Sequence, residues 1–253
     1  MTKRILRIAA LLTLAASASA MAADLPAPAY KAPLAAPVYS WTGWYIGANA
    51  GYSWGRETND WIFTGFGFGP FPAVSESQNM NGGIAGVQSG FNWQVNNQWV
   101  MGYESDIQWS GQRGSTSYCV IACGILNVAA DHRLPWFGTA RGRVGILVTP
   151  SVLLYGTAGI AYGETRSDYT LNILALPIAS ESFRVTRAGW TAGGGIEGML
   201  AYGWSAKAEA LYMDFGRDQA SFSVLGAPVV QFNNRVTDVV ARVGLNYRWG
   251  GGP

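Results

Sequence analysis

The stretch that decides the fold lies near the C-terminus, where residues 236–249 read Val-Thr-Asp-Val-Val-Ala-Arg-Val-Gly-Leu-Asn-Tyr-Arg-Trp. Apolar side chains fall on every second residue from Val239 to Trp249, and polar ones such as Asp238 and Arg242 fall on the other positions. A period of two sustained over the whole stretch predicts a β-strand with one apolar and one polar face.

The same alternation recurs along the chain. Residues 44–54 and 99–109 each place aromatic and aliphatic side chains on one face of an extended segment. We expect eight strands in all, at residues 43–54, 80–93, 98–110, 135–147, 152–163, 187–201, 203–215 and 235–249.

The connections between these strands alternate between long and short. The short ones lie at Asn96-Asn97, Thr149-Pro150 and Tyr202-Gly203, and the long ones cover residues 55–79, 111–134, 164–186 and 216–234. All short turns then lie on one side, together with both chain ends. This pattern is typical of a transmembrane antiparallel up-and-down β-barrel with short periplasmic turns and long extracellular loops. A ten-stranded barrel is the alternative if the first and fourth long connections contain an extra pair of strands.

The composition also favours a membrane barrel. Charged residues make up 13% of the 253 residues, against about 25% in ordinary globular domains. Aromatic residues make up another 13% and include 11 tryptophans. Because no run of 18 apolar residues follows the N-terminal segment, no transmembrane helix is expected. A closed barrel is the remaining way to satisfy every backbone group within a bilayer.

The N-terminal segment has the pattern of an export signal. Three basic residues precede an apolar stretch at 8–16, and Ala20-Met21-Ala22 offers a cleavage site. We expect a signal peptide at 1–22, a Pro/Ala-rich periplasmic linker at 23–40 and a barrel at 41–253; an N-terminal membrane anchor is the alternative. Removing the signal leaves 14 basic and 15 acidic residues, so no nucleic-acid binding is expected.

The tryptophans cluster near the predicted strand ends, where amphipathic rings prefer the headgroup level of a bilayer. The periplasmic belt would contain Trp44, Trp93, Trp99, Trp204 and Trp249. The outer belt would contain Trp54, Trp109, Trp136 and Trp190.

Charged residues gather on the face opposite the lipid face. The predicted lumen charge network contains Glu104, Asp106, Arg141, Arg143, Glu197, Lys207, Glu209, Asp238, Arg242 and Arg248. We expect the pairs Glu104 with Arg141, Glu197 with Lys207, and Glu209 with Arg242. Because acids and bases balance, we interpret this face as a charge-paired interior. Paired carboxylates for acid–base catalysis are the alternative.

We expect no catalytic residue, no cofactor and no metal. His132, the only histidine, falls in the second long connection, with no serine motif placed to meet it. The run Gly65-Phe66-Gly67-Phe68-Gly69 lacks the spacing of a dinucleotide loop. Cys119 and Cys123 lack the further ligands of a zinc site, so a local disulfide is predicted, with free thiols as the alternative.

Several motifs resemble the alphaproteobacterial major outer-membrane protein family, also described as porin-family or opacity-protein-like barrels. They are residues 23–26, Ser40–Gly47 (SWTGWYIG), Lys207–Gly216 (KAEALYMDFG) and Arg242–Trp249 (RVGLNYRW). The resemblance implies an eight-stranded outer-membrane barrel with roles in envelope integrity and surface interaction. In contrast to the family's usual terminal Phe, Trp249 is followed by Gly-Gly-Gly-Pro, which puts the terminal assembly signal in doubt.

The functional expectation is a non-enzymatic outer-membrane barrel that contributes to envelope structure and surface interactions. A porin-like diffusion channel for small solutes and a soluble lipocalin-type barrel are the alternatives. The expected partners are outer-membrane lipid, lipopolysaccharide and the barrel-assembly machinery. The sequence does not identify a surface ligand.

Overall fold

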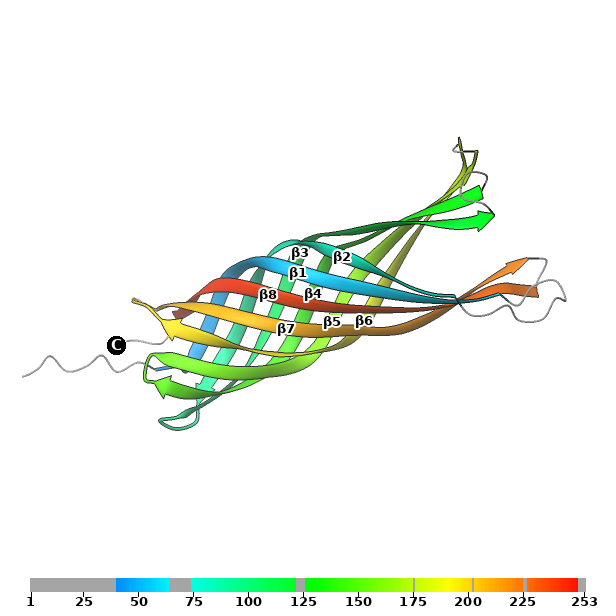
Figure 1. Ribbon diagram of the computed structural model, residues 1–253. Coiled ribbons are helices and arrows are strands. Elements are labelled where there is room, and N and C mark those ends of the chain that lie inside the picture. The colour runs from blue at the N-terminus through cyan, green and yellow to red at the C-terminus, as the bar shows by residue number, and fades with distance from the viewer. Residues whose placement is uncertain are drawn as a thin grey trace, which may run out of the picture. The chain divides into compact units, whose positions relative to one another are not determined.

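The structure, a computed structural model, describes residues 40–63, 74–121, 126–174, 176–201, 203–224 and 227–249. They form the antiparallel strands β1 (Gly43–Phe63), β2 (Val74–Gln94), β3 (Trp99–Ile121), β4 (Leu126–Thr149), β5 (Val152–Ile173), β6 (Leu176–Met199), β7 (Trp204–Val224) and β8 (Ala227–Trp249). Consecutive strands pair, and β1 pairs with β8, so the sheet closes into a barrel (Figure 1). The predicted fold class is confirmed, and the ten-stranded alternative is wrong.

The last strand shows how the alternating sequence sets the two faces. Val239, Val243 and Leu245 are exposed on the outer surface, whereas Arg242 and Asn246 are buried in the lumen. Since a shift of one residue would exchange these faces, the predicted register of this strand is confirmed.

The strands continue much further at one end than the sequence predicts. Most of the four long connections, at 55–79, 111–134, 164–186 and 216–234, belong to strands, so their prediction as loops was wrong. In the first of them the β1–β2 ladder continues through Arg56↔Asn79 to Trp61↔Val74. Outside the bilayer both faces of a strand can be polar, so pairing continues where the alternation of polarity ends.

Beyond the outer tryptophans the barrel divides into two four-stranded sheets. The β2–β3 ladder ends at the pair Asn81↔Arg113, and the β6–β7 ladder ends at Trp190↔Asp214. The other six ladders continue outward through the described residues. We call the outer parts of β3, β4, β5 and β6 the first outer sheet, and those of β7, β8, β1 and β2 the second outer sheet.

The opposite end carries the short turns that the sequence predicts. Val95 to Gln98 connect β2 to β3, and Pro150 and Ser151 connect β4 to β5. In the β6–β7 turn, Gly203 has a φ of +83°, a left-handed conformation that glycine adopts without steric cost.

Three layers of side chains fill the lumen. An apolar cap lies at the end with the short turns and consists of Trp41, Val100, Leu153 and Tyr155. Charged side chains occupy the middle. A second apolar layer lies toward the outer sheets and contains Met80, Ile84, Leu134, Phe137, Ala161, Leu211, Met213, Phe215, Val236 and Val240. The described residues contain no helix long and apolar enough to cross a membrane.

Candidate functional site

The centre of the lumen is organised around Arg141, which β4 directs inward. Its guanidinium donates to Glu104 at 2.6 Å, to Asp106 at 3.0 Å and to Glu209 at 2.8 Å. Arg242 from β8 adds a second guanidinium, 2.9 Å from Asp106 and 2.8 Å from Glu209. Two cations therefore share three carboxylates from β3 and β7, which do not pair with each other, and the hydrogen-bonded geometry offsets the cost of burying charge.

Lys207 has a different ion-pair partner from the one that the sequence predicts. It lies directly opposite Glu197 in the β6–β7 ladder, but its ammonium is 2.7 Å from Glu104 across the lumen. Glu197 instead accepts hydrogen bonds from Arg143 at 2.7 Å and from Ser205 at 2.7 Å. The predicted Glu197–Lys207 ion pair is therefore wrong. The flexible lysine side chain reaches a more central carboxylate in this narrow interior.

Two tyrosines, which the sequence analysis did not single out, connect the charged layer to the apolar cap. The Tyr45 hydroxyl donates to Glu104 at 2.8 Å and accepts from Arg143 at 3.0 Å. The Arg143 guanidinium also lies 4.0 Å from the ring centroid of Tyr155. Because the guanidinium of Arg143 is planar and charged, it can stack on one tyrosine ring and donate a hydrogen bond to the hydroxyl of the other.

Trp41 closes the same end, and the sequence analysis did not assign it to either belt. Its ring lies beneath the Arg248 guanidinium at 4.8 Å, and its indole N–H donates to the carbonyl of Pro150 at 3.1 Å. Trp41 precedes β1, so no strand alternation marks it as an inward residue. The Arg248 guanidinium also lies 3.7 Å from Glu197.

Asp238 lies in the lumen as predicted but apart from the cations. It accepts hydrogen bonds from Ser53 at 2.5 Å and from Gln112 at 2.9 Å. Among the described residues no cationic group lies within ion-pair distance of it. Neutral donors therefore satisfy this carboxylate.

His132 corrects a further prediction. It belongs to β4 rather than to a loop, and it is buried. Its Nδ1 atom lies 2.9 Å from the Ser167 hydroxyl and 3.1 Å from the Glu57 carboxylate, so a serine does meet it. Burial lowers the pKa of His132, and the neighbouring carboxylate of Glu57 opposes that shift. Ser167 and Glu57 approach the same ring nitrogen, whereas the serine and the carboxylate of a hydrolytic triad lie on opposite ring nitrogens.

The predicted aromatic belts lie on the outer surface. Eight of the nine tryptophans are 46–61% exposed, and Trp136 is half-buried against Tyr162. Ring pairs such as Trp44 with Tyr103 and Trp190 with Tyr212 extend the belts around the barrel. These exposed rings surround apolar outward residues, as expected of a surface in contact with lipid.

Other predicted features lie outside the described residues. They are the signal peptide at 1–22, most of the linker at 23–40, the glycine run at 65–69 and Cys123, and with it the predicted disulfide to Cys119. Within the described residues there is no group of three His, Cys, Asp or Glu side chains placed to hold a metal ion.

The closed sheet, the filled lumen and the aromatic belts define a small outer-membrane β-barrel. The chain belongs to the outer membrane protein beta-barrel domain family, whose model matches residues 8–248. It is 38% identical over 235 residues to the 31 kDa outer-membrane immunogenic protein of Brucella melitensis. The aligned region covers 91% of this chain and 94% of that protein.

It is also 32% identical over 193 residues to the 22 kDa outer membrane protein of Rhizobium leguminosarum, covering 74% of this chain and 72% of that protein. Among solved structures, OprG of Pseudomonas aeruginosa is 14% identical with a TM-score of 0.46, covering 85% of this chain and 100% of that one. The predicted family and the outer-membrane location are confirmed.

Proposed function

We propose that the protein is a non-enzymatic envelope barrel with a lumen closed by side chains, whose outer sheets make its surface contacts. The observation that carries this proposal is the three-layered filling of the lumen. An eight-stranded barrel encloses little more than its own side chains, whereas general porins use about 16–18 strands to enclose water. A porin-like diffusion channel is therefore the less favoured alternative.

The absence of enzymatic activity is part of the proposal. The four central carboxylates, Glu104, Asp106, Glu197 and Glu209, each contact at least one cation. A general acid or base needs a carboxylate whose proton can exchange with a substrate. These side chains are instead held in a buried network that supports a structural role.

The proposed partners are lipopolysaccharide around the outer belt and the barrel-assembly machinery during insertion. The last strand ends at Trp249, an exposed aromatic residue that supports recognition of this strand. The proposed signal peptide and linker would deliver the chain to that machinery. The names of the Brucella relatives describe immunogenic proteins, which supports exposure of the outer sheets at the cell surface.

Planar-bilayer recording tests the closed lumen. The purified protein should give no sustained large conductance over a range of voltages. A general porin, recorded under the same conditions, shows that openings can be detected. Stable openings of general-porin size in the wild-type protein would contradict the proposal and favour a diffusion channel.

A further inference from the structure

A row of four arginines crosses the outward face of the first outer sheet. Arg113 in β3 lies directly opposite Arg133 in β4, which lies opposite Arg166 in β5, which lies opposite Arg184 in β6. We call these four residues the arginine row. With strands about 4.8 Å apart, the row is about 14 Å long.

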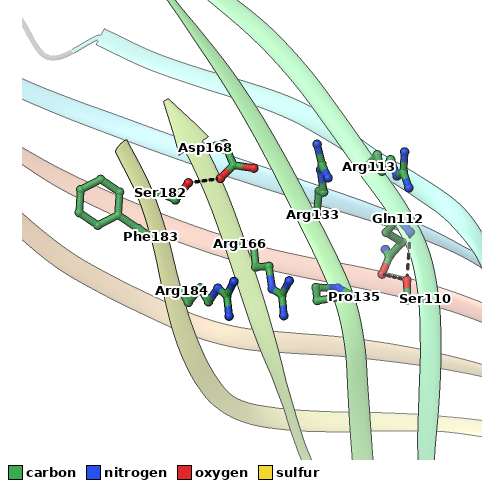
Figure 2. Close-up of a pocket in the computed structure, with 10 residues that line it drawn as sticks. All are labelled: Ser110, Gln112, Arg113, Arg133, Pro135, Arg166, Asp168, Ser182, Phe183 and Arg184. Atoms are coloured by element: carbon green, nitrogen blue, oxygen red, sulfur yellow. Dashed lines mark hydrogen bonds between the residues drawn. The ribbon is translucent and has the colours of Figure 1, made fainter. Parts of the chain in front are cut away.

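The arginine row faces outward from the barrel. Gln112 and His132, the chain neighbours of Arg113 and Arg133, are buried inside, so these two arginines point to the opposite side. Arg166 follows the same rule, because its neighbour Ser167 contacts His132. Figure 2 shows all four arginines on adjacent strands, where they line one cavity. The volume of this cavity is about 290 Å³.

Acidic side chains neutralise this row only in part, because three carboxylates, Glu164, Asp131 and Asp168, share the outward face with the four arginines. Arg166 is bound to Glu164 at 2.6 Å, but Arg113, Arg133 and Arg184 have no ion pair among the described residues. The cavity holds one acidic side chain, Asp168, which accepts a hydrogen bond from Ser182 at 2.6 Å. Like charges directly opposite each other in a sheet destabilise it. A bound anion would remove this repulsion.

The row lies just beyond the outer aromatic belt. Arg113 follows Trp109 by four residues, and Arg133 precedes Trp136 by three. Trp109 and Trp136 are themselves a ladder pair of the outer belt. Since aromatic belts lie at headgroup level, the next residues outward reach the phosphorylated headgroups of the outer leaflet.

We propose that the arginine row binds the phosphate groups of a phosphorylated glycolipid of the outer leaflet. Guanidinium groups recognise phosphate through paired, charge-assisted hydrogen bonds. Beta-bulges support the geometry: the ladder shifts register between Trp109 and Gln112 and between Arg133 and Trp136, and such bulges reorient side chains. This inference rests on the proposed envelope function, and it assigns the protein's contact with lipid headgroups to the first outer sheet.

Binding of bisphosphorylated lipid A to the detergent-extracted, full-length protein tests the proposal, with dephosphorylated lipid A as the comparison ligand. The row variant combines Arg113→Gln, Arg133→Gln and Arg184→Gln. The control variant removes the same charge from the second outer sheet and combines Arg56→Gln, Arg217→Gln and Arg235→Gln. Native mass spectrometry measures the bound fraction, and heat-modified gel mobility verifies that each variant is folded.

The row variant should bind the phosphorylated lipid about tenfold more weakly than wild type, a loss typical of removed charge-assisted contacts. The control variant should stay within about twofold. Equal losses in both variants, or equal binding of the dephosphorylated lipid, would overturn the proposal. Inorganic phosphate and soluble dextran sulfate are the competitors, each added at an anion concentration equal to that of the lipid phosphate. If either one displaces the lipid completely, the lipid assignment is likewise overturned. Because no bilayer current is measured, failure here is distinct from failure of the closed-lumen proposal.

Discussion

Arg141 and Glu209 meet across the lumen at 2.8 Å, although their strands, β4 and β7, do not pair with each other. The carboxylate of Glu209 also contacts Arg242 from β8. One acidic side chain therefore bridges two guanidinium groups and links strands from different parts of the ring.

Replacing Glu209 by alanine should destabilise the barrel by about 3–5 kcal/mol, because it removes a partner of two buried cations. Urea-induced unfolding in lipid vesicles measures the change. The control is Glu164→Ala, which removes an ion pair outside the lumen and should change the unfolding free energy little. If the two variants unfold alike, the lumen network does not stabilise the fold.

Val243→Arg should cost about 2–4 kcal/mol, because Val243 faces lipid near the middle of the part of β8 that lies between the two aromatic belts. Arg242→Lys retains a cation in the lumen and should cost less. Folding yields and unfolding free energies in vesicles compare the two. The reverse order would contradict the orientation of the last strand.

Phe137→Ala should cost about 3–5 kcal/mol, because the ring is fully buried in the outer apolar layer of the lumen. The matched control is Ile160→Ala on the lipid-facing side of the adjacent strand, where acyl chains can fill the space. An unfolding free energy equal to that of the control would show that the apolar layer is loosely packed.

The outer sheets should lose stability as the pH falls. The pKa of His132 is lowered in the folded protein, mainly by burial, so the unfolded state binds protons more readily. This stability is present above the unfolded pKa of about 6.5 and is lost below it. The protection of the outer-strand amides, corrected for intrinsic exchange, should therefore fall as the pH is lowered from about 7.5 to about 5.5.

His132→Gln should remove most of that pH dependence, since His132 is the only histidine in the chain. Amides near the periplasmic turns serve as an internal control, because they are far from His132 in the ladders. Once corrected for intrinsic exchange, their protection should not change. An unchanged pH response in the variant would assign the effect to other groups.

If Cys119 and Cys123 form the predicted disulfide, Cys123→Ser should leave the barrel folded and change only the connection after β3. Heat-modified gel mobility reports the folded barrel. Mass spectrometry of the protein from outer membranes reports the bond. Two free thiols would disprove the disulfide.

The membrane-embedded part of the barrel could be predicted because its sequence is constrained from both sides. Lipid requires apolar residues outside and the lumen favours polar ones inside, so Val243 and Arg242 alternate visibly. Beyond the outer belt neither constraint holds, and the polar strand ends resemble loops. His132 was misassigned for that reason.

The contacts within the lumen were predictable only in part. The order of strands in the sequence predicts which residues are neighbours on adjacent strands, such as Glu197 and Lys207. It does not predict contacts across a closed interior. Lys207 reaches Glu104 because the barrel brings β7 and β3 within one side-chain length of each other. The Arg141–Glu209 contact has the same origin. Such contacts depend on closure, which no local pattern encodes.

Because the barrel divides into two outer sheets, its cell-surface end is not one continuous structure. Beyond Asn81↔Arg113 and Trp190↔Asp214, no ladder joins the two sheets among the described residues, and side chains such as His132 and Glu57 connect them instead. Apart from such inward contacts, each sheet can therefore fray or acquire substitutions on its outward face while the rest of the barrel stays intact. Outward-facing residues of one sheet can diversify without compensating changes on the other.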